Sequence, residues 1–145
     1  MKNKNQMKIS ELIFRIIAPF IFLIIGTCII FPFAKGVPVT GVPKAHEIVK
    51  AEISDARTDG KTVTVSSREE IELAVNMKNF LLCEIGSSYN SNEKGDIVIR
   101  YFNSDGDVWE ISATETTLYW NGEARQLKNK GVFVNLAEAI FFEME

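Results

Sequence analysis

The chain has 145 residues, of which 46% are hydrophobic and 24% are charged, and its formal net charge is −3. The charge is unevenly distributed, because residues 1–35 hold five basic residues and one acidic residue, whereas residues 36–145 hold 11 basic and 18 acidic residues. The acidic second part is long enough for one domain with a single core, but not for two. Its acidity argues against nucleic-acid binding, because phosphate contacts need clustered Lys and Arg.

Residues 12–33 predict a helix that spans a membrane. The 18 residues from Ile16 to Phe33 are uncharged and almost wholly apolar. At about 1.5 Å per residue they extend roughly 27 Å, close to the thickness of the hydrocarbon core of a bilayer. Basic residues gather before this segment, namely Lys2, Lys4, Lys8 and Arg15. The positive-inside bias therefore predicts a cytoplasmic N-terminus and an extracytoplasmic acidic domain.

The end of the apolar segment indicates an anchor that is not cleaved. A signal-peptide cleavage site needs small residues, and bulky or rigid residues fill the region around Phe33. Lipidation of Cys28 remains the alternative, although Thr27 and the apolar residues after Cys28 are atypical of a lipoprotein. The other cysteine, Cys83, belongs to the domain, so we expect no disulfide.

A Pro- and Gly-rich segment, AKGVPVTGVPKA over residues 34–45, follows the anchor. Its prolines favour extended backbone, so it predicts a spacer of roughly 35 Å. The alternative is that part of the segment packs as an edge strand. We therefore divide the chain into a basic cytoplasmic tail (1–11), a transmembrane anchor (12–33), a linker (34–45) and an extracytoplasmic domain (46–145).

The first half of the domain predicts two strands and a helix. Residues 46–55 and 61–66 alternate apolar and polar side chains, with a turn at Asp59-Gly60 between them. In the first of these strands Val49 is expected on the buried face. Either Ser66 or Ser67 provides an N-cap with a glutamate three residues later, and the helix is expected to run to Gly86 and to include Cys83.

The second half predicts two hairpins and a final helix. Residues 96–103 and 107–113 flank a three-residue turn, and this register places Tyr101 opposite Trp109 and gathers the apolar residues on one face. Residues 116–120 and 123–127 flank Asn121-Gly122, a strong hairpin signal. The last helix is expected to begin at Asn135. The order ββαββββα predicts an α+β domain with an antiparallel sheet and both helices on one face.

Four segments of the domain together resemble a known type of protein. They read VTVSSREEIELAVNMKNFL, GDIVIRYFNSDGDVWEI, TTLYWNGEARQL and LAEAIFFEME. Over roughly residues 48–145 they resemble an uncharacterised family of small extracytoplasmic α+β domains of Gram-positive bacteria, which are lipoproteins or are tethered by one membrane helix. The resemblance implies a fold and a location, but no activity. Such domains often carry an aromatic residue after the Asn-Gly turn, where this chain has Ala124 and Arg125.

Candidate catalytic and metal-binding residues are sparse. His46 is the single histidine and lies beside the linker, so neither a Ser–His pair nor a histidine-based metal site is expected. The run from Asn103 to Asp107 has calcium-like oxygens, but an EF-hand loop would need acids where Tyr101 and Ser112 stand. Weak calcium binding stays open as an alternative to a plain turn. We expect no cofactor, no metal and no enzymatic activity.

The remaining candidates for function are aromatic and apolar side chains of the sheet. Phe102, Val108 and Trp120 are expected on or near its solvent face, where they would form a surface that binds another protein of the cell envelope. The sequence therefore favours a membrane-anchored domain that binds a protein or senses conditions at the envelope. Two alternatives are a hydrolase of the cell envelope, and an immunity or inhibitor protein whose target lies in the membrane.

Overall fold

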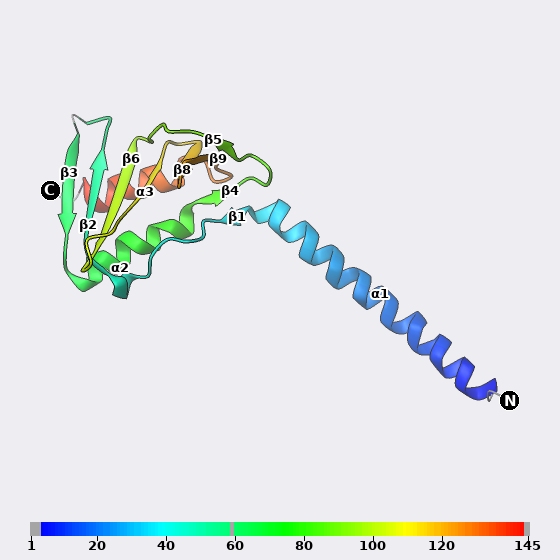
Figure 1. Cartoon of the computed structure of the whole chain (residues 1–145). Coiled ribbons are helices and arrows are strands. Elements are labelled where there is room, and N and C mark those ends of the chain that lie inside the picture. Colours follow the sequence, from blue (N-terminus) through cyan, green and yellow to red (C-terminus); the bar gives the residue numbers. More distant parts are fainter. Residues whose placement is uncertain (1–3, 59, 144–145) are drawn as a thin grey trace. The chain divides into compact units, whose positions relative to one another are not determined.

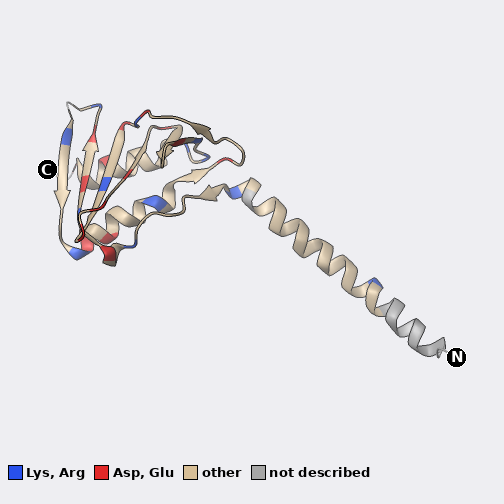
Figure 2. Ribbon diagram, viewed as in Figure 1, with Lys and Arg blue, Asp and Glu red and all other residues tan. Residues whose placement is uncertain are grey.

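We describe the fold from a computed structural model, which places residues 4–58 and 60–143. The chain forms two units, Met1–Lys35 and Gly36–Glu145. The first unit contains the helix α1 (Lys4–Lys35). Its segment Ile13–Lys35 has 23 residues, and among the described residues it is the one helix long and apolar enough to cross a membrane. Figure 2 shows that this segment carries no charged residue between Arg15 and Lys35.

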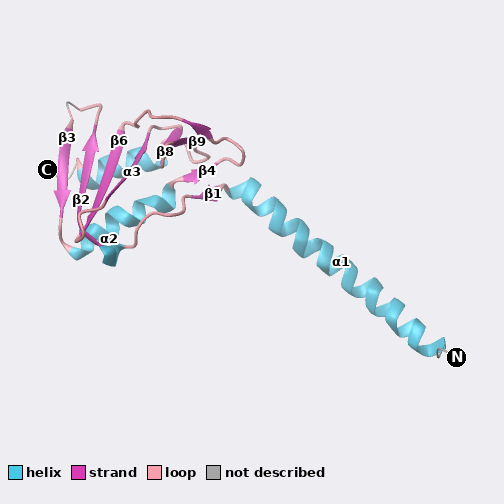
Figure 3. Cartoon of the chain, in the orientation of Figure 1, coloured by secondary structure: helices cyan, strands magenta, loops and turns pink. Residues whose placement is uncertain are grey.

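The second unit is an α+β domain built on one large antiparallel sheet (Figure 1). Its seven strands are β2 (Ile48–Asp55), β3 (Lys61–Val65), β5 (Tyr89–Asn90), β6 (Ile97–Asn103), β7 (Val108–Ala113), β8 (Thr117–Trp120) and β9 (Glu123–Gln126). They lie side by side in the order β3-β2-β6-β7-β8-β9-β5. The helices α2 (Arg68–Asn76) and α3 (Val132–Phe141) cover one face (Figure 3). The predicted α+β fold is confirmed.

The predicted register of the hairpin β6–β7 is also confirmed. Tyr101 lies opposite Trp109, Ile99 lies opposite Ile111, and the Asn103 N–H donates to the carbonyl of Asp107 across 3.2 Å. The same side of β2 adds further apolar side chains to this face. The core is formed where these strands meet buried residues of the two helices, namely Ile71, Ala74 and Val75 of α2 and Phe133, Val134 and Ala137 of α3.

Tyr101 connects the sheet to α2 through a buried hydrogen bond. Its hydroxyl donates to the carbonyl of Ala74 across 3.0 Å, and burial raises the pKa of this tyrosine. We expect Tyr101→Phe to lower the free energy of unfolding by about 1–2 kcal/mol, because the aromatic ring stays and one buried carbonyl loses its donor. Urea unfolding of the full chain in detergent micelles, followed by tryptophan fluorescence, measures this change. A variant as stable as the wild type would contradict the expectation.

Three predicted details of the domain are wrong. Val49 is exposed, because a β-bulge between Ile48 and Lys50 turns it out of the alternating pattern. The helix capped by Ser67 ends at Asn76 and continues as a 3₁₀ turn, η2 (Met77–Phe80). The last helix begins at Val132 after Gly131, whose φ of +74° suits a glycine, and not at Asn135.

The segment expected as a spacer packs on the domain in the structure. β1 (Val37–Pro38) pairs with β4 (Leu82–Cys83), which is the edge-strand alternative and also removes Cys83 from the predicted helix. Val39 and Val42 are buried in the core. The indole N–H of Trp120 donates to the carbonyl of Thr40 across 3.1 Å. The compact unit therefore begins at Gly36.

The chain crosses the sheet between β5 and β6. β5 lies at an edge beyond β9, whereas β6 lies between β2 and β7, so residues 91–96 must pass over β9, β8 and β7. We call these residues the crossing loop. Its Gly95 N–H donates to the Ser112 hydroxyl across 3.0 Å, and Lys94 forms an ion pair with Glu110. Ser112 and Glu110 both point away from α2 and α3. The crossing loop therefore covers part of the sheet face that the two helices leave uncovered.

Candidate binding surface on the open sheet face

The open face is the side of the sheet that α2 and α3 leave uncovered. The side chains of β2, β6 and β7 that point to it alternate with the core residues. The central ones are Lys50 and Glu52 of β2, Arg100 and Phe102 of β6, and Val108 and Glu110 of β7. The register places these six side chains in two rows across the strands. The apolar row is Lys50, Phe102 and Val108, and the charged row is Glu52, Arg100 and Glu110.

Phe102 and Val108 form the apolar row of the open face. They lie directly opposite each other on β6 and β7. The side chain of Val108 is 52% exposed, and Phe102 is half-buried. The ammonium group of Lys50 lies 4.2 Å from the centroid of the Phe102 ring and 2.7 Å from a carboxylate oxygen of Glu52. This pair therefore forms a small exposed apolar contact bordered by a cation.

Glu110 is the centre of the charged row. Its carboxylate accepts from Arg100 Nε across 2.7 Å and pairs with Lys94 Nζ of the crossing loop across 2.8 Å. Burial alone would raise the pKa of Glu110, but hydrogen bonds and charge from Lys94 and Arg100 hold it below its usual value. The glutamate is therefore ionised and neutralised by two partners, which suits a structural role better than that of a catalytic acid.

The structure separates Trp120 from Phe102 and Val108. Trp120 lies opposite Ile111, whose side chain is buried on the helix-covered face. Its indole contacts the segment before β2, because it donates to Thr40 and a Cβ at Gly41 would lie 4.0 Å from its ring. The predicted surface is thus divided: Phe102 and Val108 lie together on the open face, and Trp120 is half-buried on the other.

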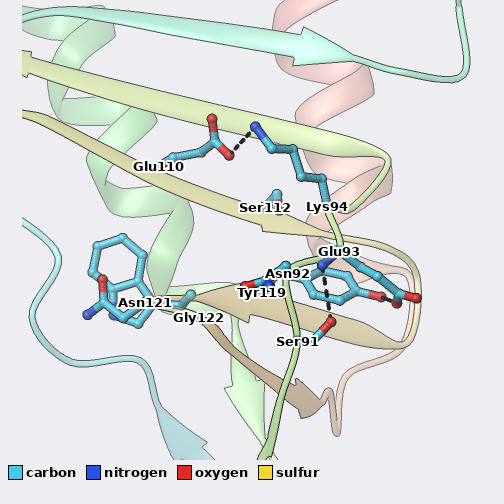
Figure 4. Close-up of a pocket in the computed structure, with 10 residues that line it drawn as sticks. Ser91, Asn92, Glu93, Lys94, Glu110, Ser112, Tyr119, Asn121 and Gly122 are labelled. Carbon is cyan, nitrogen blue, oxygen red and sulfur yellow. Dashed lines mark hydrogen bonds and ion pairs between the residues drawn. The ribbon is translucent and has the colours of Figure 1, made fainter.

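A polar hollow of about 190 Å³ lies between the crossing loop and the strands β7 and β8. Figure 4 shows Lys94 directed toward Glu110, and Tyr119 directed toward Glu93. The Tyr119 hydroxyl donates to Glu93 across 3.3 Å, and burial together with the charge of Glu93 raises the pKa of Tyr119. Lys94 and Glu110 therefore form an ion pair in this hollow, and Glu93 accepts from the Tyr119 hydroxyl. Sequence reasoning missed it, because no local pattern indicates where a polar loop crosses a sheet.

The other residues considered from the sequence are placed as follows. Asn103 Oδ1 accepts the N–H groups of Asp105 and Asp107 across 3.0 Å and 2.8 Å, so it serves as the acceptor of a turn. Cys83 is buried, and burial raises the pKa of its thiol. His46 is exposed in the 3₁₀ turn η1 (Ala45–Glu47). Over residues 4–58 and 60–143, no three His, Cys, Asp or Glu side chains gather as metal ligands would.

Comparison with known proteins adds no relative. No protein-family model, no curated protein and no solved structure matches the chain. The resemblance to small Gram-positive extracytoplasmic domains therefore stays a prediction, and the candidate surface rests on the chain's own geometry.

Proposed function

We propose that the protein is a membrane-anchored, extracytoplasmic domain that binds another envelope protein and is not an enzyme. The observation that carries the proposal is the division of the chain. The segment Ile13–Lys35 of α1 is long and apolar enough to cross a membrane, whereas Gly36–Glu145 forms a compact unit with its own core. An apolar helix of this length is stable in a bilayer, where lipid covers its side chains.

The charge distribution supports a cytoplasmic N-terminus. The basic residues before the apolar segment favour the cytoplasmic side, and the acidic domain follows on the other. Protease digestion of intact spheroplasts tests this, using a tag at the C-terminus and the mass of the mature protein. Loss of the tag at full-length mass supports an uncleaved anchor with an external domain. Protection of the tag would place the domain in the cytoplasm and overturn the proposal.

The pair Phe102–Val108 supports a protein as the ligand. An exposed aromatic and aliphatic pair on a rigid sheet offers apolar area, and the neighbouring Lys50 offers one cation for a polar rim. The acids around it are engaged: Glu110 pairs with Arg100 and Lys94, and Glu52 pairs with Lys50. This arrangement resembles a contact surface more closely than a site with a free acid and base.

We expect Phe102→Ala to abolish binding while it lowers the free energy of unfolding by only about 1 kcal/mol, because the ring is half-buried. A photo-crosslinking residue at Val108 should capture one defined partner in cells, and Phe102→Ala should remove that adduct. The matched control is the same crosslinker at Asn76, an exposed position at the end of α2, on the opposite side of the sheet. Capture that is equal at both positions, or unaffected by Phe102→Ala, would contradict this surface.

A further inference from the structure

The membrane helix and the domain are joined without a free linker residue. α1 ends at Lys35, and the next residue, Gly36, has a φ of +88°. A Cβ at Gly36 would lie 3.1 Å from the carbonyl oxygen of Cys83 and 3.2 Å from the Cβ of Leu82. Gly36 is thus already in contact with β4, and Val37 is paired with Cys83. The 12-residue spacer suggested by the sequence is absorbed into the domain.

This junction limits how far the domain can lie from the bilayer. The 23 residues of Ile13–Lys35 extend about 35 Å, so in a spanning helix Lys35 reaches the headgroup layer. Two peptide units separate the Cα atoms of Lys35 and Val37, so these atoms are at most about 7 Å apart. Whatever the angle between the helix and the domain, Val37 is therefore held in or beside the headgroup layer.

The surface around Val37 is suited to that layer. A hollow of about 170 Å³ brings Val37 together with Cys83, Ile85 and Arg125. Val37 is 36% exposed and Ile85 is 45% exposed. The loop that follows Ile85 is Gly86-Ser87-Ser88, small and uncharged. The hollow is also lined by two charged residues, Glu84 and Arg125. Apolar side chains among small polar groups and a pair of opposite charges are compatible with the boundary between headgroups and acyl chains.

We propose that this end of the domain, formed by Val37 and residues 84–88, docks on the lipid surface of the bilayer that holds α1. We call it the membrane-facing end. Ile85 contacts the upper acyl chains, and the serines of the loop remain among the headgroups. The proposal rests on the proposed membrane anchor, and it adds a second contact that holds the domain at the membrane surface.

Depth-dependent fluorescence quenching tests this contact in the full chain. Cys28→Ser removes the exposed cysteine, and Cys83 is buried, so a single new cysteine is labelled with an environment-sensitive fluorophore. The reporters are Ile85→Cys and Val37→Cys, and the matched control is Thr64→Cys. Thr64 lies on β3, which forms one edge of the sheet (Figure 1). The membrane-facing end lies near the other edge, because Leu127, the residue after β9, bridges to Cys83 of β4. The protein is reconstituted in phosphatidylcholine vesicles that contain a lipid spin-labelled near the top of its acyl chain.

We expect quenching at residues 85 and 37 to exceed quenching at residue 64 several-fold. Insertion of ten Gly/Ser residues between Lys35 and Gly36 should reduce it, because such a linker has an end-to-end distance of about 17 Å. Equal weak quenching at residues 85 and 64, in protein that floats with the vesicles, would overturn the docking while leaving the anchor intact. Protein that fails to float would overturn the anchor itself. Quenching unchanged by the insertion would overturn the role of the short junction.

Discussion

Gly95→Ala is expected to destabilise the domain by about 2–4 kcal/mol, because a methyl group has no room where the crossing loop meets β7. A Cβ at this position would lie 2.2 Å from the carbonyl carbon of Ala113 and 2.4 Å from its nitrogen. These backbone atoms belong to the last residue of β7, and the two residues before it, Ile111 and Ser112, are also buried. The loop would have to lift, which would lengthen the hydrogen bond from Gly95 to Ser112.

Urea unfolding of the full chain in detergent micelles measures this effect. Both tryptophans, Trp109 and Trp120, lie in the domain, so their fluorescence reports its unfolding without a signal from α1. The matched control is Gly86→Ala, where φ is +75° but no atom lies within 4 Å of the added carbon. That variant should lose only about 1–2 kcal/mol, from backbone strain alone. If both variants lost the same stability, the close approach of the loop would not be a constraint.

The elements that the sequence predicts correctly are those with strong local signals. The hairpin β6–β7 follows from alternation and a three-residue turn, and the pair Asn121-Gly122 adopts φ values of +52° and +76° between β8 and β9. The N-cap at Ser67 follows from its spacing to Glu70, whose N–H donates to the serine across 3.3 Å. The turn residue Asp59 lies outside the described residues. In each of these elements the stabilising contact joins residues that are close in the sequence.

The details that the sequence misses depend on distant contacts. Residues 82–83 look helical by their apolar pattern, but they pair with β1, more than forty residues earlier. The same contact turns a Pro-rich segment that resembles a spacer into part of the core. The sequence predicts Trp120 on or near the solvent face, but it lies opposite Ile111 on the helix-covered face, where its indole donates to Thr40. The pair Phe102–Val108 lies on the open face, as the local register of the hairpin predicts.

Arg57→Met is expected to lower the free energy of unfolding at pH 7 by about 3 kcal/mol, because it leaves a buried carboxylate without its partner. Asp55 is 1% exposed and accepts from Arg57 Nε across 3.1 Å, Arg57 Nη2 across 2.9 Å and the Arg57 backbone N–H across 2.9 Å. Arg57 also bonds to Glu138 of α3, so it connects the end of β2 to the helix layer. Methionine keeps the apolar length of the side chain and removes only its charge and donors.

The pH dependence should identify the cause of this loss. Burial alone would raise the pKa of Asp55, but the hydrogen bonds and charge of Arg57 hold it below its usual value. The wild type therefore gains stability from Asp55 above the unfolded pKa of about 3.9, and it loses this gain as the pH falls through the lowered folded pKa. Without Arg57, burial should raise the folded pKa. In this variant the contribution of Asp55 to the free energy of unfolding is fully present below about pH 3.9. It is lost as the pH rises through the raised folded pKa of Asp55.

The deficit of Arg57→Met relative to the wild type should therefore be largest at pH 7 and should shrink as the pH falls toward 4. Urea midpoints of both proteins across this range measure it. Arg68→Met is the matched control, because Arg68 forms an exposed pair with Glu72 and its loss should change stability by less than about 0.5 kcal/mol. Asp55→Asn added to Arg57→Met should remove the dependence, since an amide does not titrate. A loss of stability that is the same at every pH would show that Arg57 acts through packing. The charge of Asp55 would then play no part in holding the hairpin β2–β3 against α3.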